Sequence, residues 1–167
     1  SMTEQKLLSL VRQAVERYRM VQAGDKIAVG VSGGKDSLTL LYALSRLASF
    51  YPEPFSVCAV CVDLGMEGAD FAGIKEFAGK LDVELKIVAT QIGQIVLRER
   101  KESNPCSLCA KMRKGALVKE ALDMGCNKIA YAHHKDDFVE TMLMSLIFQG
   151  RFYAFPPVTW FDDTGLH

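Results

Sequence analysis

The sequence predicts an α/β domain in which helices cover both faces of an open parallel sheet. Short apolar runs rich in β-branched residues alternate with stretches whose apolar residues recur at helical spacing. Such alternation pairs the strands in parallel through right-handed crossovers. The glycine-rich and acidic segments directly follow strands, which is where open sheets of this class bind their ligands.

Length and composition fit one globular domain. The chain has 167 residues, of which 49% are hydrophobic and 24% are charged, which excludes a disordered or low-complexity chain. Lysine plus arginine and aspartate plus glutamate each number 20, so any nucleic-acid contact needs a local basic patch. No apolar run approaches the roughly 18 residues of a membrane span, and the charged N-terminus has no signal-peptide core. We therefore expect a cytoplasmic protein with no membrane partner.

The order of the elements follows from the spacing of the apolar residues. We divide the chain into an N-terminal helix at residues 1–23 and a ligand-binding domain at residues 24–167. Strands are expected at 26–31, 57–62, 84–89 and 128–132. Helices are expected at 38–48, 71–81, 110–124 and 136–149, while residues 91–105 are polar and indicate no clear element.

A glycine-rich segment joins the first strand to the following helix. It contains two adjacent glycines, a lysine, an aspartate and two serines: Ser32, Gly33, Gly34, Lys35, Asp36 and Ser37. A loop in this position points backbone N–H groups at an anion, and the glycines let a phosphate approach closely. Neither the Walker A pattern nor Gly-x-Gly-x-x-Gly is present. The alternative is an ordinary turn in which Asp36 or Ser37 caps the helix.

A second polar segment follows the fourth strand. It contains two histidines, two aspartates, a glutamate and a threonine: His133, His134, Asp136, Asp137, Glu140 and Thr141. In a helix starting at Asp136, Asp137 shares a face with Glu140 and Thr141, and a carboxylate beside a phosphate suits Mg²⁺. Two alternatives stay open: Asp136 is only an N-cap, or the histidines and Asp137 bind zinc.

Four of the five cysteines form two Cys-x-x-Cys pairs, and the fifth stands alone. The pairs are Cys58 with Cys61 and Cys106 with Cys109, and the single residue is Cys126. Cys106 and Cys109 stand at the mouth of a predicted helix, where thiolates are favoured and metal or persulfide chemistry becomes accessible. Disulfide redox chemistry and structural zinc are the alternatives for this pair. Cys58 and Cys61 lie three apart in a predicted strand and point to opposite faces. We expect those two, and Cys126, to be structural.

These segments resemble the N-type ATP pyrophosphatases, also called the PP-loop family. Residues 31–37, Val-Ser-Gly-Gly-Lys-Asp-Ser, look like the pyrophosphate loop of that family. Residues 132–141 resemble the His-x-x-Asp-Asp-x-x-Glu-Thr signature of lysidine synthetases and 2-thiocytidine synthases. The Cys106 and Cys109 pair, followed by a basic helix, resembles the Cys-x-x-Cys of the ATP-dependent tRNA 2-thiocytidine synthases. The resemblance to these enzymes extends over nearly the whole chain. The resemblance implies a Rossmann-like, adenine nucleotide alpha hydrolase-like (PP-loop ATPase) domain.

The resemblance also implies a function: adenylation of a tRNA cytidine, release of pyrophosphate, and replacement of the C2 oxygen by sulfur. It implies that ATP is bound by residues 32–37 together with Asp63 and His133, although Asp63 could also simply end its strand in a turn with Gly65. The implied catalytic residues are Lys35, Asp36, Asp137, Cys106 and Cys109. Mg²⁺ would be held by Asp36 and Asp137, and a [4Fe–4S] cluster by Cys106 and Cys109. The implied RNA-binding residues are Arg113, Lys114 and Arg151, the first two of which could instead form a solvated helix face.

The implied partners are tRNA, a sulfur donor such as a cysteine desulfurase, and a second copy in a homodimer. The family pattern continues beyond this chain with further cysteine ligands, so we expect a C-terminally truncated chain with an incomplete cluster site. Cys126 cannot complete it, since about fourteen helical residues separate it from Cys109 by roughly 20 Å. The alternatives are a 2-thiouridine synthase or lysidine synthetase, a non-catalytic nucleotide-binding regulator of the same fold, and a metal-binding redox module.

Overall fold

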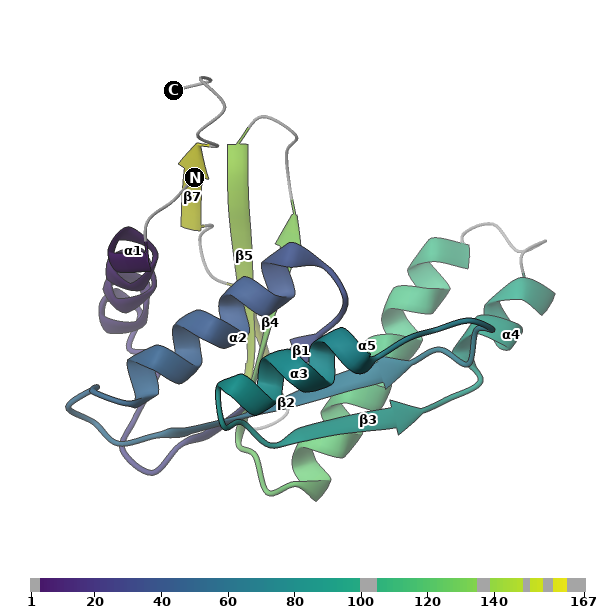
Figure 1. Cartoon of the computed structure of the whole chain (residues 1–167), viewed down its shortest axis with the longest axis horizontal. Coiled ribbons are helices and arrows are strands. Elements are labelled where there is room, and N and C mark those ends of the chain that lie inside the picture. The colour runs from purple at the N-terminus through teal and green to yellow at the C-terminus, as the bar shows by residue number, and fades with distance from the viewer. Residues whose placement is uncertain (1–3, 100–104, 135–138, 149–150, 155–157, 162–167) are drawn as a thin grey trace.

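A sheet with four parallel strands at its centre organises the chain. The computed structural model describes residues 4–99, 105–134, 139–148, 151–154 and 158–161. The strand order is β3-β2-β1-β4-β5-β6, with β7 paired to β5 (Figure 1). The parallel strands are β1 (Lys26–Val31), β2 (Ser56–Asp63), β3 (Leu85–Ala89) and β4 (Lys128–His134). The antiparallel strands are β5 (Val139–Phe148), β6 (Arg151–Ala154) and β7 (Val158–Phe161).

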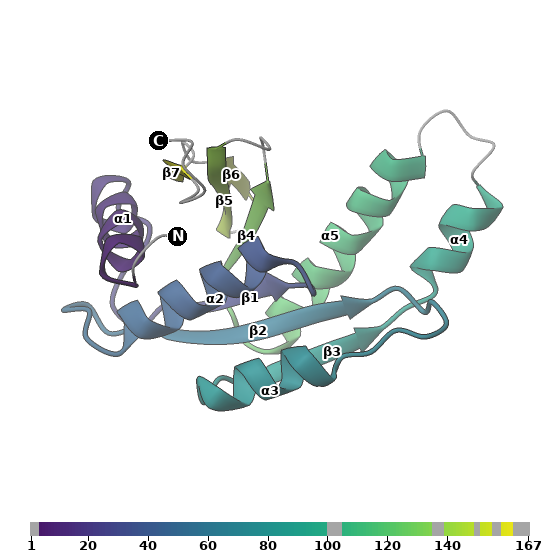
Figure 2. The ribbon, with the colours of Figure 1, turned by 45° about the horizontal axis from the view of Figure 1, so that its top comes forward.

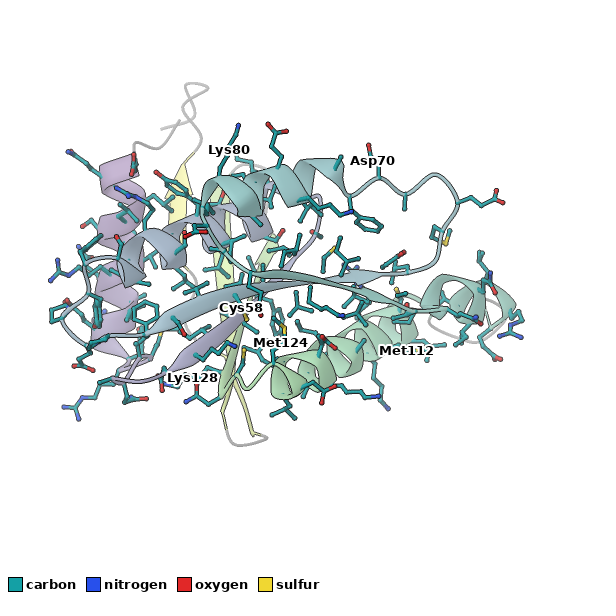
Figure 3. The ribbon with its side chains drawn as sticks, turned by 60° about the horizontal axis from the view of Figure 1, so that its bottom comes forward. Cys58, Asp70, Lys80, Met112, Met124 and Lys128 are labelled. Carbon is teal, nitrogen blue, oxygen red and sulfur yellow. The ribbon has the colours of Figure 1, made fainter. Side chains whose placement is uncertain are left out.

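Helices cover both faces of the parallel strands, as the sequence predicts. The helices on one face are α1 (Glu4–Arg17), α2 (Lys35–Ala48) and α3 (Ala72–Lys80). The opposite face is covered by α5 (Pro105–Asp123), so α3 and α5 lie on either side of the strands in Figure 3. A further helix, α4 (Ile92–Arg98), lies beside α5 at the end of the sheet where β2 and β3 finish (Figure 2). Over the described ranges, no helix is both long and apolar enough to cross a bilayer.

Two separate apolar cores result, one on each face of the sheet. Val29 of β1 packs with residues of α1, α2 and α3, whereas its neighbour Ala28 packs with residues of α5. Because both faces are covered, the strands read as continuous apolar runs rather than alternating ones. Gly30 lets α5 approach β1 closely, since a Cβ there would lie 2.9 Å from a methyl group of Leu117.

A buried ion pair fixes the register between β1 and β4 at the amino ends of the two strands. Lys128 Nζ lies 2.6 Å from Asp25 Oδ2, and both side chains are almost fully buried. Lys128 Nζ also donates to the carbonyl of Met20 at 2.6 Å and to Gln22 Oε1. Asn127 Nδ2 donates to the second carboxylate oxygen of Asp25 at 2.8 Å. The charges are therefore compensated on every side, as burial requires.

The predicted order of elements is confirmed as far as β4, although several bounds differ: α1 ends at Arg17, α2 begins at Lys35 and β4 continues to His134. Helix α5 begins at Pro105, five residues before the expected position 110, and a proline is well tolerated in a first helical turn. The polar segment at 91–105, which indicated no clear element, contains α4. Its Ile92 is buried, so a short apolar face was present within the polar stretch.

The helix expected at residues 136–149 is wrong for the part that the structure describes. Residues 139–148 form β5, which pairs antiparallel with β4 from Lys128↔Phe148 to His134↔Met142. The segment is nearly continuously apolar, and such a short run does not distinguish a buried helix from a strand. Glu140 and Thr141 therefore do not have the helical spacing that would group them with Asp137, which lies outside the described residues.

Candidate functional site

A pocket opens at the carboxyl ends of β1 and β2. Its volume is about 490 Å³, and Ser32, Gly33 and Asp63 contribute its polar lining together with Asp70. The parallel register pairs Val31 with Cys61, so the residues that follow each strand emerge side by side. The structure thus brings the glycine loop and Asp63 together, as the sequence predicts for the ligand edge of this sheet.

Two serine hydroxyls hold the glycine loop in shape. Ser37 Oγ accepts the Ser32 N–H at 2.9 Å and donates to the Gly34 carbonyl at 3.1 Å. Ser32 Oγ accepts the Gly34 N–H at 3.1 Å. The N-cap of α2 is Gly34 in an extended conformation without a side-chain cap, and Asp36 lies in the first helical turn. The alternative in which Asp36 or Ser37 merely caps the helix is therefore not what the structure shows.

The loop has the shape and the charge of an anion site. The backbone at Gly33 is exposed, and apart from Gly33 and its two chain neighbours no described atom lies within 4 Å of where its Cβ would be. A Cβ at Gly34 would lie 3.3 Å from Ser32 Oγ, which leaves little room for a side chain. The fourteen-residue helix α2 points its positive end here, and Lys35 is exposed at its first position. An open cradle of this charge can accept a phosphate group.

Asp63 both forms a turn and lines the pocket. Its Oδ1 accepts the Gly65 N–H at 2.8 Å, and Gly65 has a φ of +78° that favours glycine. The local turn that sequence reasoning kept as an alternative is therefore present. It coexists with the functional hypothesis, because Asp63 is also part of the pocket lining.

Sequence reasoning missed the apolar wall of the pocket. Most of its side chains come from the segment after β2 and from α3, with one from the start of α2: Leu38, Cys61, Leu64, Met66, Phe71, Ile74 and Phe77. The helical spacing of Phe71, Ile74 and Phe77 was the available signal, but it indicated only a packed helix face. An apolar wall beside an anion cradle can hold a flat ring that carries a phosphate chain.

Cys61 combines the structural role expected from sequence with a place in the pocket lining. Only 3% of it is exposed, and burial raises the pKa of its thiol, although the nearby Arg113 guanidinium opposes that rise. Cys58 lies on the opposite face, between the sheet and α5 (Figure 3), so the prediction that the two cysteines face apart is confirmed.

Cys58 has a partner that the sequence did not reveal. Its Sγ lies 3.3 Å from Cys126 Sγ in the core beneath α5. Burial and the contact with Cys126 raise the pKa of Cys58 to about 12. The Cys58 thiol is therefore neutral, and both cysteines are buried in the core, which agrees with the structural role predicted for them.

The other cysteine pair lies in the first turns of α5. Cys109 is partly exposed, and Cys106 occupies the second position of the helix. Within the described side chains, no three histidine, cysteine, aspartate or glutamate residues gather closely enough to hold a metal ion. Cys58, Cys61 and Cys126 are buried, and the side chain of Cys106 lies outside the described residues.

The structure describes only some of the remaining predicted site residues. Arg113 and Lys114 are exposed on α5, and His133 lies near the carboxyl end of β4, the strand that pairs in parallel with β1. Arg151 begins β6. Asp137 lies outside the described residues, and so do the side chains of His133, Cys106 and Arg151. Their roles stay predictions.

Comparisons with known proteins agree with this geometry. A family model for the PP-loop domain matches residues 2–155. The tRNA-cytidine(32) 2-sulfurtransferase of Anaeromyxobacter dehalogenans is 38% identical over 155 residues, which cover 92% of this chain and 53% of the relative. The enzyme of the same name from Pelobacter propionicus is 39% identical over 150 residues, which cover 89% of this chain and 56% of the relative. The chain spans about half the length of the curated relatives it matches.

Solved structures share the fold. The U34-tRNA thiolase NcsA from Methanococcus maripaludis, determined with its [4Fe–4S] cluster, superposes with a TM-score of 0.63 at 29% identity. The match covers 78% of this chain and 44% of the thiolase. The NH3-dependent NAD synthetase from Campylobacter jejuni has a TM-score of 0.50 at 19% identity, covering 77% of this chain and 56% of the synthetase, and supports the fold alone.

Proposed function

Because the chain belongs to the PP-loop domain family, we propose that it binds ATP. We further propose that it takes part in the ATP-dependent transfer of sulfur to a cytidine of tRNA. The observation that carries the proposal is that the glycine loop, Asp63 and an apolar wall line one and the same pocket. The likeness to relatives named tRNA-cytidine(32) 2-sulfurtransferase supports cytidine as the target.

We propose that ATP spans the pocket with its two ends on different elements. The phosphates lie over Gly33 and Gly34 at the N-terminus of α2, where Lys35 and the helix dipole offset their charge. The adenine packs on the apolar wall, and the Asp63 carboxylate accepts a hydrogen bond from a ribose hydroxyl. This orientation leaves the α-phosphate near the carboxyl end of the sheet, where His133 is the penultimate residue of β4.

The proposed reaction has two displacements. The C2 oxygen of cytidine attacks the α-phosphorus, the bond to the bridging oxygen of the β-phosphate breaks, and pyrophosphate leaves. The outer sulfur of a persulfide on a donor of the cysteine desulfurase class then attacks C2, the carbon–oxygen bond breaks, and AMP leaves with the former C2 oxygen. A thiol reductant breaks the remaining sulfur–sulfur bond, so that the thiol is oxidised to a disulfide with the donor cysteine and the sulfur stays on C2. The chain's own contribution to the first step is electrostatic, because Lys35 and the loop amides stabilise charge that gathers on the leaving pyrophosphate.

Two further groups are implied, and they fit the described residues to different degrees. The Asp36 carboxylate, partly exposed beside the loop, is a suitable donor for Mg²⁺, with Asp137 proposed as the second. Bound Mg²⁺ would neutralise phosphate charge. Cys106 and Cys109 are the proposed thiolates of a [4Fe–4S] cluster, which would supply a sulfur-delivery site. The described side chains do not complete that ligand set of three or four, so no step is derived through it.

The proposed partners follow from the same assignment. Arg113 and Lys114, exposed on α5, would bind tRNA phosphates, together with Arg151. A homodimer and a cytoplasmic location remain part of the proposal. The likeness to the U34-tRNA thiolase favours a second candidate, thiolation of uridine.

Pyrophosphate release tests the proposal. We expect tRNA to stimulate release from ATP by the wild-type chain, and Lys35→Ala to lower it at least tenfold, since a hydrogen bond to a charged group contributes about 1.5–3 kcal/mol. Asp137→Asn is expected to lower it as well. Lys80→Ala, on the exposed end of α3, is the matched control and should act like wild type. Release that is independent of tRNA and of Lys35 would overturn the proposal.

A further inference from the structure

The pocket wall formed by residues 63–66 rests on the start of α4. The Thr90 N–H donates to the Asp63 carbonyl at 3.0 Å, and Thr90 Oγ1 donates to the same oxygen at 2.7 Å. The Gly93 N–H donates to the Leu64 carbonyl at 2.9 Å. Three hydrogen bonds therefore hold two consecutive carbonyl groups of the turn that carries the Asp63 carboxylate.

The two segments fit so closely that side chains are excluded from both. Gly93 is buried. A Cβ on Gly93 would lie 2.9 Å from the Leu64 carbonyl oxygen and would overlap Met66 Sδ. A Cβ on Gly65 would lie 2.6 Å from the Thr90 carbonyl oxygen. Because backbone atoms are in the way, an added methyl group at Gly93 must move the whole turn.

We propose that Thr90 and Gly93 are positioning residues for the adenosine end of the nucleotide site, a proposal that rests on the proposed function. Neither residue lines the pocket, whereas Asp63, Leu64 and Met66 do. The two residues fix the position of the turn at residues 63–66. They thereby fix the positions at which the Asp63 carboxylate and the Met66 side chain contact a ligand.

The phosphate end of the pocket is held independently. Its shape depends on the hydroxyls of Ser32 and Ser37 and on the start of α2. Within the described part of the chain, the loop makes no hydrogen bond to Thr90 or Gly93. Shifting the turn should therefore weaken contacts to adenosine and leave contacts to phosphate intact. A general loss of folding would instead weaken both to the same extent.

The test compares ATP with inorganic tripolyphosphate by titration calorimetry on the 167-residue chain. The variants are Gly93→Ala, which displaces the turn, and Thr90→Val, which removes the hydroxyl donor while keeping the shape. Thr90→Ser restores the hydroxyl. Gly79→Ala is the matched control, because the added methyl group meets no described atom within 4 Å apart from its chain neighbours and the nearby backbone of its own helix.

We expect Gly93→Ala and Thr90→Val to bind ATP about tenfold more weakly, the loss that one hydrogen bond explains, and to bind tripolyphosphate as wild type does. Thr90→Ser and Gly79→Ala should match wild type for both ligands. Wild-type affinity for ATP in both test variants overturns the inference while the proposed function stands, and so does an equal loss for the two ligands. Failure of the wild-type chain to bind ATP overturns both. If Gly93→Ala does not fold, the contrast between Thr90→Val and Thr90→Ser decides.

Discussion

Replacing Lys128 with methionine is expected to destabilise the fold by about 3–5 kcal/mol, the range for breaking a buried ion pair from one side. The Lys128 and Asp25 side chains are only 3% and 6% exposed, and their charged atoms are 2.6 Å apart. Methionine fills the space of the lysine stem but leaves the Asp25 carboxylate buried without its cation. The carbonyl of Met20 also loses its donor.

Urea and thermal unfolding measure this loss. For a domain of this size each kcal/mol lowers the melting temperature by about 2–4 °C, so the variant should melt about 6–20 °C lower. The control is Lys80→Met, whose ion pair with Glu76 spans 3.4 Å between side chains that are 74% and 70% exposed. That change should stay within about 0.5 kcal/mol. Equal, small losses in both variants would refute the reasoning that the buried pair holds β1 against β4.

Three further outcomes follow from the packing and the titrating groups. Burial alone would raise the pKa of Asp25, but hydrogen bonds from Gln22, Lys128 and Asn127 outweigh burial and lower that pKa from its ordinary value. The urea midpoint should therefore fall as the pH drops below about 4, and a midpoint that is flat to pH 2 would contradict this. Iodoacetamide should label Cys109 in the native state and reach Cys58 and Cys126 only on unfolding, as mass mapping of the labelled peptides can check. Gly30→Ala should lower the unfolding free energy by about 1–2 kcal/mol in urea titrations, because the new methyl group meets Leu117 of α5. An unchanged urea midpoint would show that α5 moves aside without loss of stability.

The parts of the molecule set by local chemistry could be predicted from sequence. The glycine loop after β1 and the opposite orientation of Cys58 and Cys61 both follow from rules that span a few residues. The place of Asp63 follows from one further rule, that parallel strands carry their following loops to one edge of the sheet. These rules require no knowledge of which distant segments pack together.

The parts set by long-range packing could not be predicted. Residues 139–148 have no alternation of polar and apolar positions, so only the pairing with β4 decides that they form a strand. Cys126 reaches Cys58 across 68 positions of sequence, and Gly93 meets Leu64 only because α4 folds back on the turn after β2. Each of these contacts depends on tertiary structure that local spacing does not encode.

The nucleoside composition of tRNA tests the central claim most directly. Mass spectrometry of tRNA from cells that lack the natural gene should show no 2-thiocytidine. The gene should restore this nucleoside, and the same gene carrying Lys35→Ala should not. If 2-thiocytidine persists in cells without the gene, or if 2-thiouridine is the nucleoside that disappears, the assignment of this site to cytidine thiolation is wrong.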